Sequence, residues 1–187
     1  MKQYLVLCFI LLLGCQLSGQ TKFCKVYETR SNLEKRKRLD TAIAPFFFYT
    51  SPSMRPYLHS QEAISCYGFL SYFTGGYYLL NLIFVVKLAN APQLYGTIPA
   101  RGELVVMFLD GKYSKLKASD EVIGRFDKVT ESYIYEVQYL MSGNQVKWLE
   151  EKSVDRVRVT WSTGYEEYEV FDVDYLVDAF DCIQSHL

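Results

Sequence analysis

The sequence lacks the short motifs that identify most enzymes. It contains no glycine-rich phosphate-binding loop, no GxSxG nucleophile elbow and no HExxH zinc motif. No pair of its cysteines has the CxxC spacing, so the sequence gives no support for a zinc ribbon or a thioredoxin-type site. Only two histidines are present, His59 and His186, and His186 is next to the last residue. These absences favour a binding or structural function over catalysis, and no cofactor is expected.

The chain also lacks an overall excess of acidic or of basic residues. The chain has 20 Lys and Arg against 21 Asp and Glu, a formal net charge of -1, which argues against a strongly basic nucleic-acid binder. The charges are nevertheless uneven, because residues 20–101 hold ten basic and four acidic residues and residues 102–187 hold nine and seventeen. The basic run 34–38 fits anionic lipid headgroups or, more simply, a solvated helix or linker. Alternatively, the two halves attract each other within one fold.

What the chain does contain is apolar surface. Of its 187 residues, 50% are hydrophobic and 16% aromatic, which excludes a disordered chain. The length corresponds to one domain, with two small domains as the alternative.

The N-terminal apolar run is too short to cross a bilayer. It covers residues 5–13, whereas a transmembrane helix needs about 20 residues. Together with Lys2 before it and small residues after it, the run is typical of a secretory signal peptide, residues 1–19. The segment Leu12-Leu13-Gly14-Cys15 also resembles a bacterial lipobox. In that alternative, residues 1–14 are removed and Cys15 carries a lipid.

Export determines how the cysteines are interpreted. Cys24, Cys66 and Cys182 remain after the leader and Cys15 are set aside. An oxidising compartment favours one disulfide among these three, and the sequence does not choose the pair. The alternative is three buried thiols.

Residues 20–60 are expected to form a tether followed by a segment rich in proline and aromatic residues. Residues 20–44 are polar and charged, with at most one short helix, and Pro45, Pro52 and Pro56 then interrupt regular structure. The folded domain is expected over residues 61–187. Its first part, residues 61–74, fits helical and strand spacing equally well.

The rest of the chain predicts an α+β fold: a mainly antiparallel sheet with a short capped helix and a C-terminal amphipathic helix packed on one face. Ser142 and Gln145 form the capping box of the short helix. Residues 90–101 and 118–130 are expected to be loops, the latter with a short helix as the alternative. The expected strands are 77–89, 104–109, 112–117, 132–141, 156–161 and 165–171, and the expected helices end near residues 152 and 183.

The order of these elements resembles uncharacterised domains of exported proteins and lipoproteins from Gram-negative bacteria. The resemblance covers about residues 77–187, from the first long strand through the Asp110-Gly111 hairpin and the Gly164 turn to the helix ending near Cys182. Its motifs are structural, and it implies no known activity.

Three groups of residues are candidate sites. Cys66 and His59 are the only candidate nucleophile and base. Asp174, Asp178 and Asp181 share a helix face and are candidate calcium ligands, although solvation and helix capping explain them more simply. Tyr133, Tyr135 and Tyr139 share one face of the strand 132–141, where they form either an exposed binding platform or part of the core.

The sequence therefore predicts a non-catalytic binding domain, periplasmic or attached to the outer membrane of a Gram-negative bacterium. The expected partner is an envelope protein or a glycan, and nucleic acid is not expected. Two alternatives remain: a small periplasmic hydrolase that uses Cys66 or a pair of carboxylates, and a purely structural lipoprotein.

Overall fold

The computed structural model describes residues 24–30, 37–58 and 62–187. The predicted leader, the lipobox with Cys15 and the candidate base His59 lie outside these residues. Within them, no helix combines the length and the apolar character that a membrane span requires.

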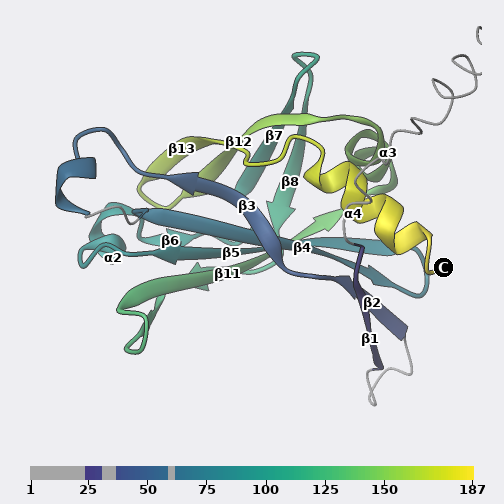
Figure 1. Ribbon diagram of the computed structural model, residues 1–187, viewed down its shortest axis with the longest axis horizontal. Coiled ribbons are helices and arrows are strands. Elements are labelled where there is room, and N and C mark those ends of the chain that lie inside the picture. The colour runs from purple at the N-terminus through teal and green to yellow at the C-terminus, as the bar shows by residue number, and fades with distance from the viewer. Residues whose placement is uncertain (1–23, 31–36, 59–61) are drawn as a thin grey trace, which may run out of the picture.

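Antiparallel strands dominate the fold, as expected, and the helices are few and short (Figure 1). The main sheet has eleven strands, in the order β1-β2-β4-β5-β11-β8-β7-β12-β13, with β3 paired to β4 and β10 paired to β11. Its strands are β1 (Val26–Arg30), β2 (Lys37–Thr41), β3 (Ala44–Tyr49), β4 (Ile64–Phe73), β5 (Tyr77–Val86), β7 (Glu103–Phe108), β8 (Tyr113–Ala118), β10 (Arg125–Asp127), β11 (Ser132–Met141), β12 (Val154–Trp161) and β13 (Gly164–Glu169).

Two short strands and four helical segments complete the described part of the chain. The strands β6 (Thr97–Ile98) and β9 (Val122–Ile123) form a separate two-stranded sheet. The helical segments are η1 (Arg55–Tyr57), α2 (Ala91–Leu94), α3 (Gly143–Glu151) and α4 (Tyr175–Gln184).

Residues 20–60 were predicted to form a tether and a segment rich in proline and aromatic residues before the folded domain, but the described part of them belongs to that domain. The strands β1, β2 and β3 all belong to the main sheet. In β2 the buried Leu39 and Thr41 alternate with less buried polar residues, so a half-polar segment still supplies one buried face. Pro45 is accommodated because the β3–β4 register shifts between Pro45 and Phe47, and such irregular positions tolerate a missing backbone donor.

The structure also resolves the ambiguous segments. Residues 64–73 form the strand β4, which pairs with β5 along its whole length. The loop expected over residues 90–101 contains the short helix α2 and the strand β6, and residues 118–130 contain β9 and β10.

The core lies where the sheet bends over itself. In Figure 1, β7, β8, β12 and β13 lie above β4, β5 and β11. The ring centre of Trp161 lies 5.2 Å from that of Phe84, 4.9 Å from that of Tyr95 and 5.3 Å from that of Tyr135. Aromatic residues from three strands and from the end of α2 therefore join the two layers, which explains much of the high aromatic content.

The helices α3 and α4 lie side by side at one end of the sheet (Figure 1). Gln184 of α4 donates a hydrogen bond of 2.9 Å to Glu150 of α3, and the Phe180 ring packs 5.1 Å from that of Tyr78 on β5. At the first residue of α4, the ring of Tyr175 lies 5.3 Å from that of Phe46 on β3. A disulfide between Cys182 and Cys24 joins α4 to the segment before β1.

Gly124, between β9 and β10, is required by a close approach to the core. A Cβ at this position would lie 2.3–2.7 Å from atoms of the Tyr135 ring and its hydroxyl. We expect Gly124→Ala to lower the free energy of unfolding by about 1–3 kcal/mol, because overpacking displaces a buried side chain. Urea unfolding measures this effect. Gly143→Ala is the matched control, because an added Cβ there meets nothing within 4 Å. An equal effect of both substitutions would contradict the packing of Gly124 on Tyr135.

Candidate functional site

Cys66, the candidate nucleophile, lies on β4 with none of its surface exposed. Burial raises the pKa of its thiol well above the usual value, so the reactive thiolate is disfavoured. A buried neutral thiol does not fit nucleophilic catalysis. The Sγ atom has a weak contact of 3.8 Å with the carbonyl oxygen of Tyr67, and a backbone hydrogen bond at Ile83 offsets only a small part of the effect of burial on the pKa.

We expect iodoacetamide at pH 8 to leave Cys66 unmodified in the folded protein and to modify it fully in urea. The reason is that both access and deprotonation require unfolding. Peptide mapping by mass spectrometry measures modification at residue 66 itself. Rapid modification of the folded protein would contradict the buried position and would restore Cys66 as a candidate nucleophile.

The candidate calcium ligands do not converge. The carboxylate of Asp174 accepts a hydrogen bond of 2.5 Å from Ser153, Asp178 lines a pocket and Asp181 is exposed. Within the described residues, the one group of three that could hold a metal ion is Cys24, Cys182 and His186. Because both sulfur atoms of that group are bonded to each other, they are not available as thiolate ligands. The three aspartates, which were weak candidates for calcium ligands, therefore do not form a cluster that could hold a metal ion.

Of the two interpretations of the β11 tyrosines, the exposed platform is wrong, and Tyr135 and Tyr139 belong to the core. Tyr135 and Tyr139 have none of their surface exposed, and Tyr133 is half-buried against Phe126, with ring centres 5.1 Å apart. Burial raises the pKa values of Tyr135 and Tyr139. The alternation along β11 was predicted, but the tyrosine face points into the core.

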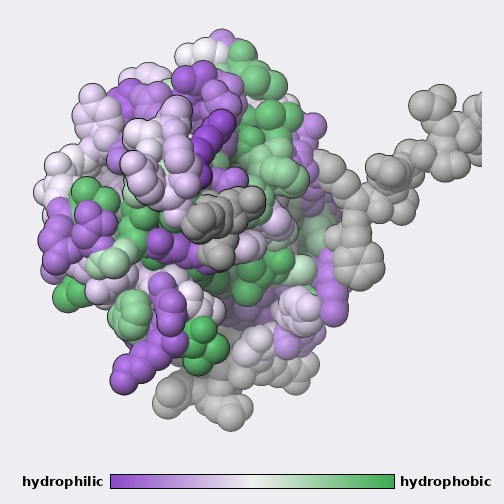
Figure 2. Space-filling view, turned by 60° about the vertical axis from the view of Figure 1, so that its left-hand side comes forward, coloured by the Kyte–Doolittle hydropathy of each residue, from purple (hydrophilic) through white to green (hydrophobic). Residues whose placement is uncertain are grey.

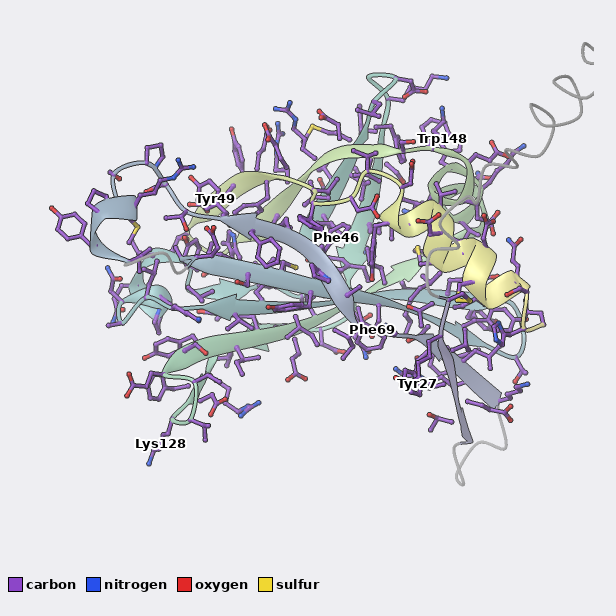
Figure 3. The ribbon with its side chains drawn as sticks, viewed as in Figure 1. Tyr27, Phe46, Tyr49, Phe69, Lys128 and Trp148 are labelled. Atoms are coloured by element: carbon purple, nitrogen blue, oxygen red, sulfur yellow. A yellow bond between two sulfur atoms is a disulfide. The ribbon has the colours of Figure 1, made fainter. Side chains whose placement is uncertain are left out.

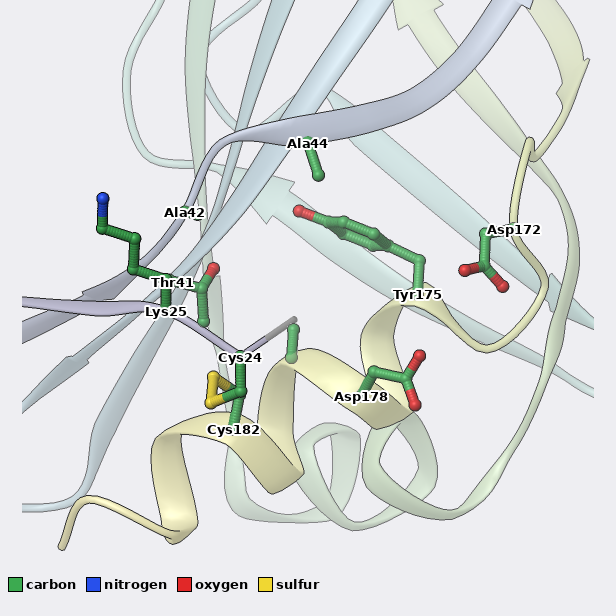
Figure 4. A pocket seen from close by; sticks show the side chains of 10 residues that line it. Cys24, Lys25, Thr41, Ala42, Ala44, Asp172, Tyr175, Asp178 and Cys182 are labelled. Atoms are coloured by element: carbon green, nitrogen blue, oxygen red, sulfur yellow. A yellow bond between two sulfur atoms is a disulfide. The ribbon is translucent and has the colours of Figure 1, made fainter. Parts of the chain in front are cut away.

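One pocket lies beside the disulfide, between α4 and the strands β2 and β3 (Figure 4). It has a volume of about 250 Å³. Tyr175 reaches across it toward Ala44, and the Tyr175 hydroxyl is buried without a hydrogen-bond partner among the described residues. The other lining residues are Cys24, Lys25, Thr41, Ala42, Asp172, Asp178, Ala179 and Cys182.

A larger groove, of about 400 Å³, opens between β3 and β13. Tyr49 lies at the end of β3 that faces η1, whereas Phe46 lies farther back along the strand, near α4 (Figure 3). The residues that line the groove come from two parts of the chain that are distant in sequence. Its residues are Phe48, Tyr49, Thr50, Pro52, Arg55, Glu62, Arg156, Glu167, Tyr168 and Glu169.

Charged and hydrogen-bonded side chains surround this groove. Glu167 accepts from Arg158, with Nε of Arg158 2.9 Å from Oε1, and Arg156 lies 3.9 Å from the other oxygen of Glu167. Tyr168 donates a hydrogen bond of 2.7 Å to Glu166. Burial and the Glu166 carboxylate raise the pKa of Tyr168, so its hydroxyl stays neutral. Such a groove can bind polar or charged groups.

Exposed aromatic rings lie next to the groove. Phe48 is 39% exposed and Phe171 is 68% exposed, and their rings meet edge to face at 5.7 Å. Tyr67 packs against Phe48 with a centroid distance of 6.3 Å. Figure 2 shows that hydrophobic residues on the forward-facing surface occur as separate patches among hydrophilic ones. We call Phe48, Phe171, Glu167 and Glu169, with the groove between them, the β3–β13 groove.

The sequence contained only a partial signal for this groove. The alternation of Arg156 and Arg158, and of Glu167 and Glu169, indicated a polar outer face on the two last strands. No local pattern indicated that residues 48–55 lie beside them.

Comparison of the chain with family models, curated proteins and solved structures finds no match.

Proposed function

We propose that the chain is an exported envelope protein that binds a protein or glycan partner without catalysing a reaction. The observation that carries the proposal is the β3–β13 groove, which combines exposed aromatic rings with carboxylates and arginines. Aromatic and arginine side chains are enriched where proteins recognise partners.

Export is part of the same proposal. The Cys24–Cys182 disulfide supports it, because disulfides persist mainly in oxidising compartments. The apolar run 5–13 and the resemblance to exported Gram-negative proteins support it as well. The proposal places the protein in the periplasm or on the outer membrane, with Cys15 as the lipid-bearing residue in the anchored form.

The proposal also includes the finer arrangement of the helices. In it, α3 is a capped helix, supported by the hydrogen bond of 2.6 Å from the Ser142 amide to Gln145. The amphipathic helix α4 covers one face of the sheet, supported by its contacts with β2 and β4.

The binding function is tested by capture from the native envelope. Tagged wild-type protein should retain a protein or glycan partner that Phe48→Ala/Phe171→Ala loses, because this variant removes both exposed rings beside the groove. Tyr113→Ala is the matched control, since Tyr113 is an aromatic residue 58% exposed on β8 and does not line the groove. Thermal unfolding confirms that the variants fold. Equal capture by both variants, or no specific capture by the wild type, would refute a binding function of the groove.

A further inference from the structure

The outer edge of β13 has unpaired backbone groups. Only Ser162 and Thr163 separate β12 from β13, so the flanking pair Trp161 and Gly164 is a hydrogen-bonded pair of the hairpin. Hydrogen-bonded pairs alternate along an antiparallel ladder. Glu166 and Tyr168 therefore bond to β12, whereas the backbone groups of Tyr165, Glu167 and Glu169 point the other way.

That free edge faces β3 across the groove. Phe171 follows Glu167 and Glu169 at the same two-residue spacing, so its backbone amide points to the same side of the strand. This amide donates a hydrogen bond of 2.7 Å to the carbonyl oxygen of Phe46. Within the described residues, this is the one backbone hydrogen bond between the β3 segment and the β13 segment. Near Phe46 and Phe171 the two segments are joined, and the rings of Phe47 and Tyr168 also stack, with centres 4.3 Å apart. The groove opens beyond these contacts, where Thr50 and Glu167 line it.

We propose that an extended segment of a partner protein, with Lys or Arg at alternate positions, adds to β13 as a further antiparallel or parallel strand in the β3–β13 groove. This inference rests on the proposed binding function and names the class of partner. Strand addition uses backbone hydrogen bonds for affinity and the alternate side chains for specificity. The edge amides and carbonyls of Glu167 and Glu169 supply the backbone partners.

The charge pattern of β12 indicates why the segment is basic. Arg156 lies opposite Glu169 and Arg158 lies opposite Glu167 on one side of β13. An added strand lies on the other side of the same two glutamates and is favoured by opposite charge at the facing positions. Within the described residues, Glu169 has no ion pair shorter than 4 Å, so its carboxylate is available to a new cation.

The exposed rings supply the apolar part of the same site. Phe48 and Phe171 lie on either side of the junction between β3 and β13, and their edge-to-face contact holds them together. The aliphatic stem of a Lys or Arg can pack on such rings while its charged end reaches a carboxylate. A simpler explanation of the acids is that charge on an edge strand prevents aggregation, and that explanation predicts no peptide binding.

The test uses three fluorescent nonapeptides and the folded chain. The first is TKVKTKVKT, the second is TEVETEVET, and the third is the first peptide with alternate backbone amides N-methylated. Fluorescence anisotropy measures binding at low and high salt. We expect the basic peptide to bind. Both other peptides should bind about tenfold more weakly or worse, because they lose charge complementarity or several backbone hydrogen bonds of about 1 kcal/mol each.

Charge reversal provides the matched variants. Glu167→Lys/Glu169→Lys should reverse the preference between the first two peptides, whereas Asp120→Lys/Glu136→Lys should preserve it, because Asp120 and Glu136 are exposed acids away from the groove. Circular dichroism confirms that each variant folds.

Equal binding of basic and acidic peptides, undiminished binding of the N-methylated peptide, or no peptide binding would overturn strand addition. Envelope capture by the same variants separates this failure from failure of the proposed function. If Phe48→Ala/Phe171→Ala loses the envelope partner while the peptides do not bind, the groove binds by another mode. If Phe48→Ala/Phe171→Ala captures as much envelope material as the wild type, the binding function itself is refuted.

Discussion

Removal of the Cys24–Cys182 disulfide is expected to lower the free energy of unfolding by about 5 kcal/mol, from the loop-entropy relation. The two cysteines are 158 residues apart, so the bond restricts nearly the whole described chain in the unfolded state. In the folded state, the same bond joins α4 to the segment before β1.

Urea unfolding of Cys24→Ala/Cys182→Ala, compared with the wild type, measures this loss. The wild type in the presence of a dithiol reductant should approach the variant, and the variant itself should not respond to the reductant. A wild-type midpoint that does not move under full reduction would contradict a stabilising disulfide.

Phe47→Ala is expected to lower the free energy of unfolding by about 3–5 kcal/mol, the usual cost of emptying a buried aromatic position. Phe47 has none of its surface exposed, and its ring stacks on that of Tyr168 with centroids 4.3 Å apart and meets Phe84 edge to face at 5.9 Å. The substitution therefore removes the main aromatic contact between β3 and β13.

Phe48→Ala is the control for this substitution, because Phe48 is the next residue on the same strand and is 39% exposed. It loses much less buried area, so a smaller loss, of about 1 kcal/mol or less, is expected. Both values come from denaturant titration followed by circular dichroism. Similar losses for the two variants would contradict the placement of Phe47 in the core and Phe48 outside it.

Elements with local signals were predicted well from the sequence. The strand expected over residues 132–141 is β11, with the same bounds, because its alternation is uninterrupted. The hairpin turn at Asp110-Gly111 was recognised from its turn residues, and Gly111 indeed has a φ of 79°. The last helix was predicted from its apolar spacing, and α4 ends at Gln184.

Elements that depend on distant partners were missed. The strands β1 and β2 are short and largely polar, and β3 is short and contains Pro45. β2 and β3 become strands through pairing with β4. Alternation also shows which residues share a face but not which face is buried, so Tyr135 and Tyr139 were left as candidates for an exposed platform.

The β3–β13 groove could not be predicted because its two walls come from segments that are distant in the sequence. Phe48 and Arg55 come from the segment predicted to be rich in proline and aromatic residues and to precede the folded domain, and Glu167 and Glu169 come from the last hairpin. The sequence did indicate that the C-terminal half is acidic and that the last two strands have a charged outer face. What it lacked was the contact that brings exposed aromatic rings to that face.

The most direct test of the account is amide hydrogen exchange at β13, measured residue by residue by nuclear magnetic resonance. In the free protein, the amides of Glu167 and Glu169 should exchange fast and that of Tyr168 slowly, because only Tyr168 bonds to β12. Saturating basic peptide should slow exchange at Glu167 and Glu169 and leave Tyr168 unchanged. Protected amides at Glu167 and Glu169 in the free protein, or unaltered exchange with the peptide bound, would contradict a free edge that accepts a partner strand.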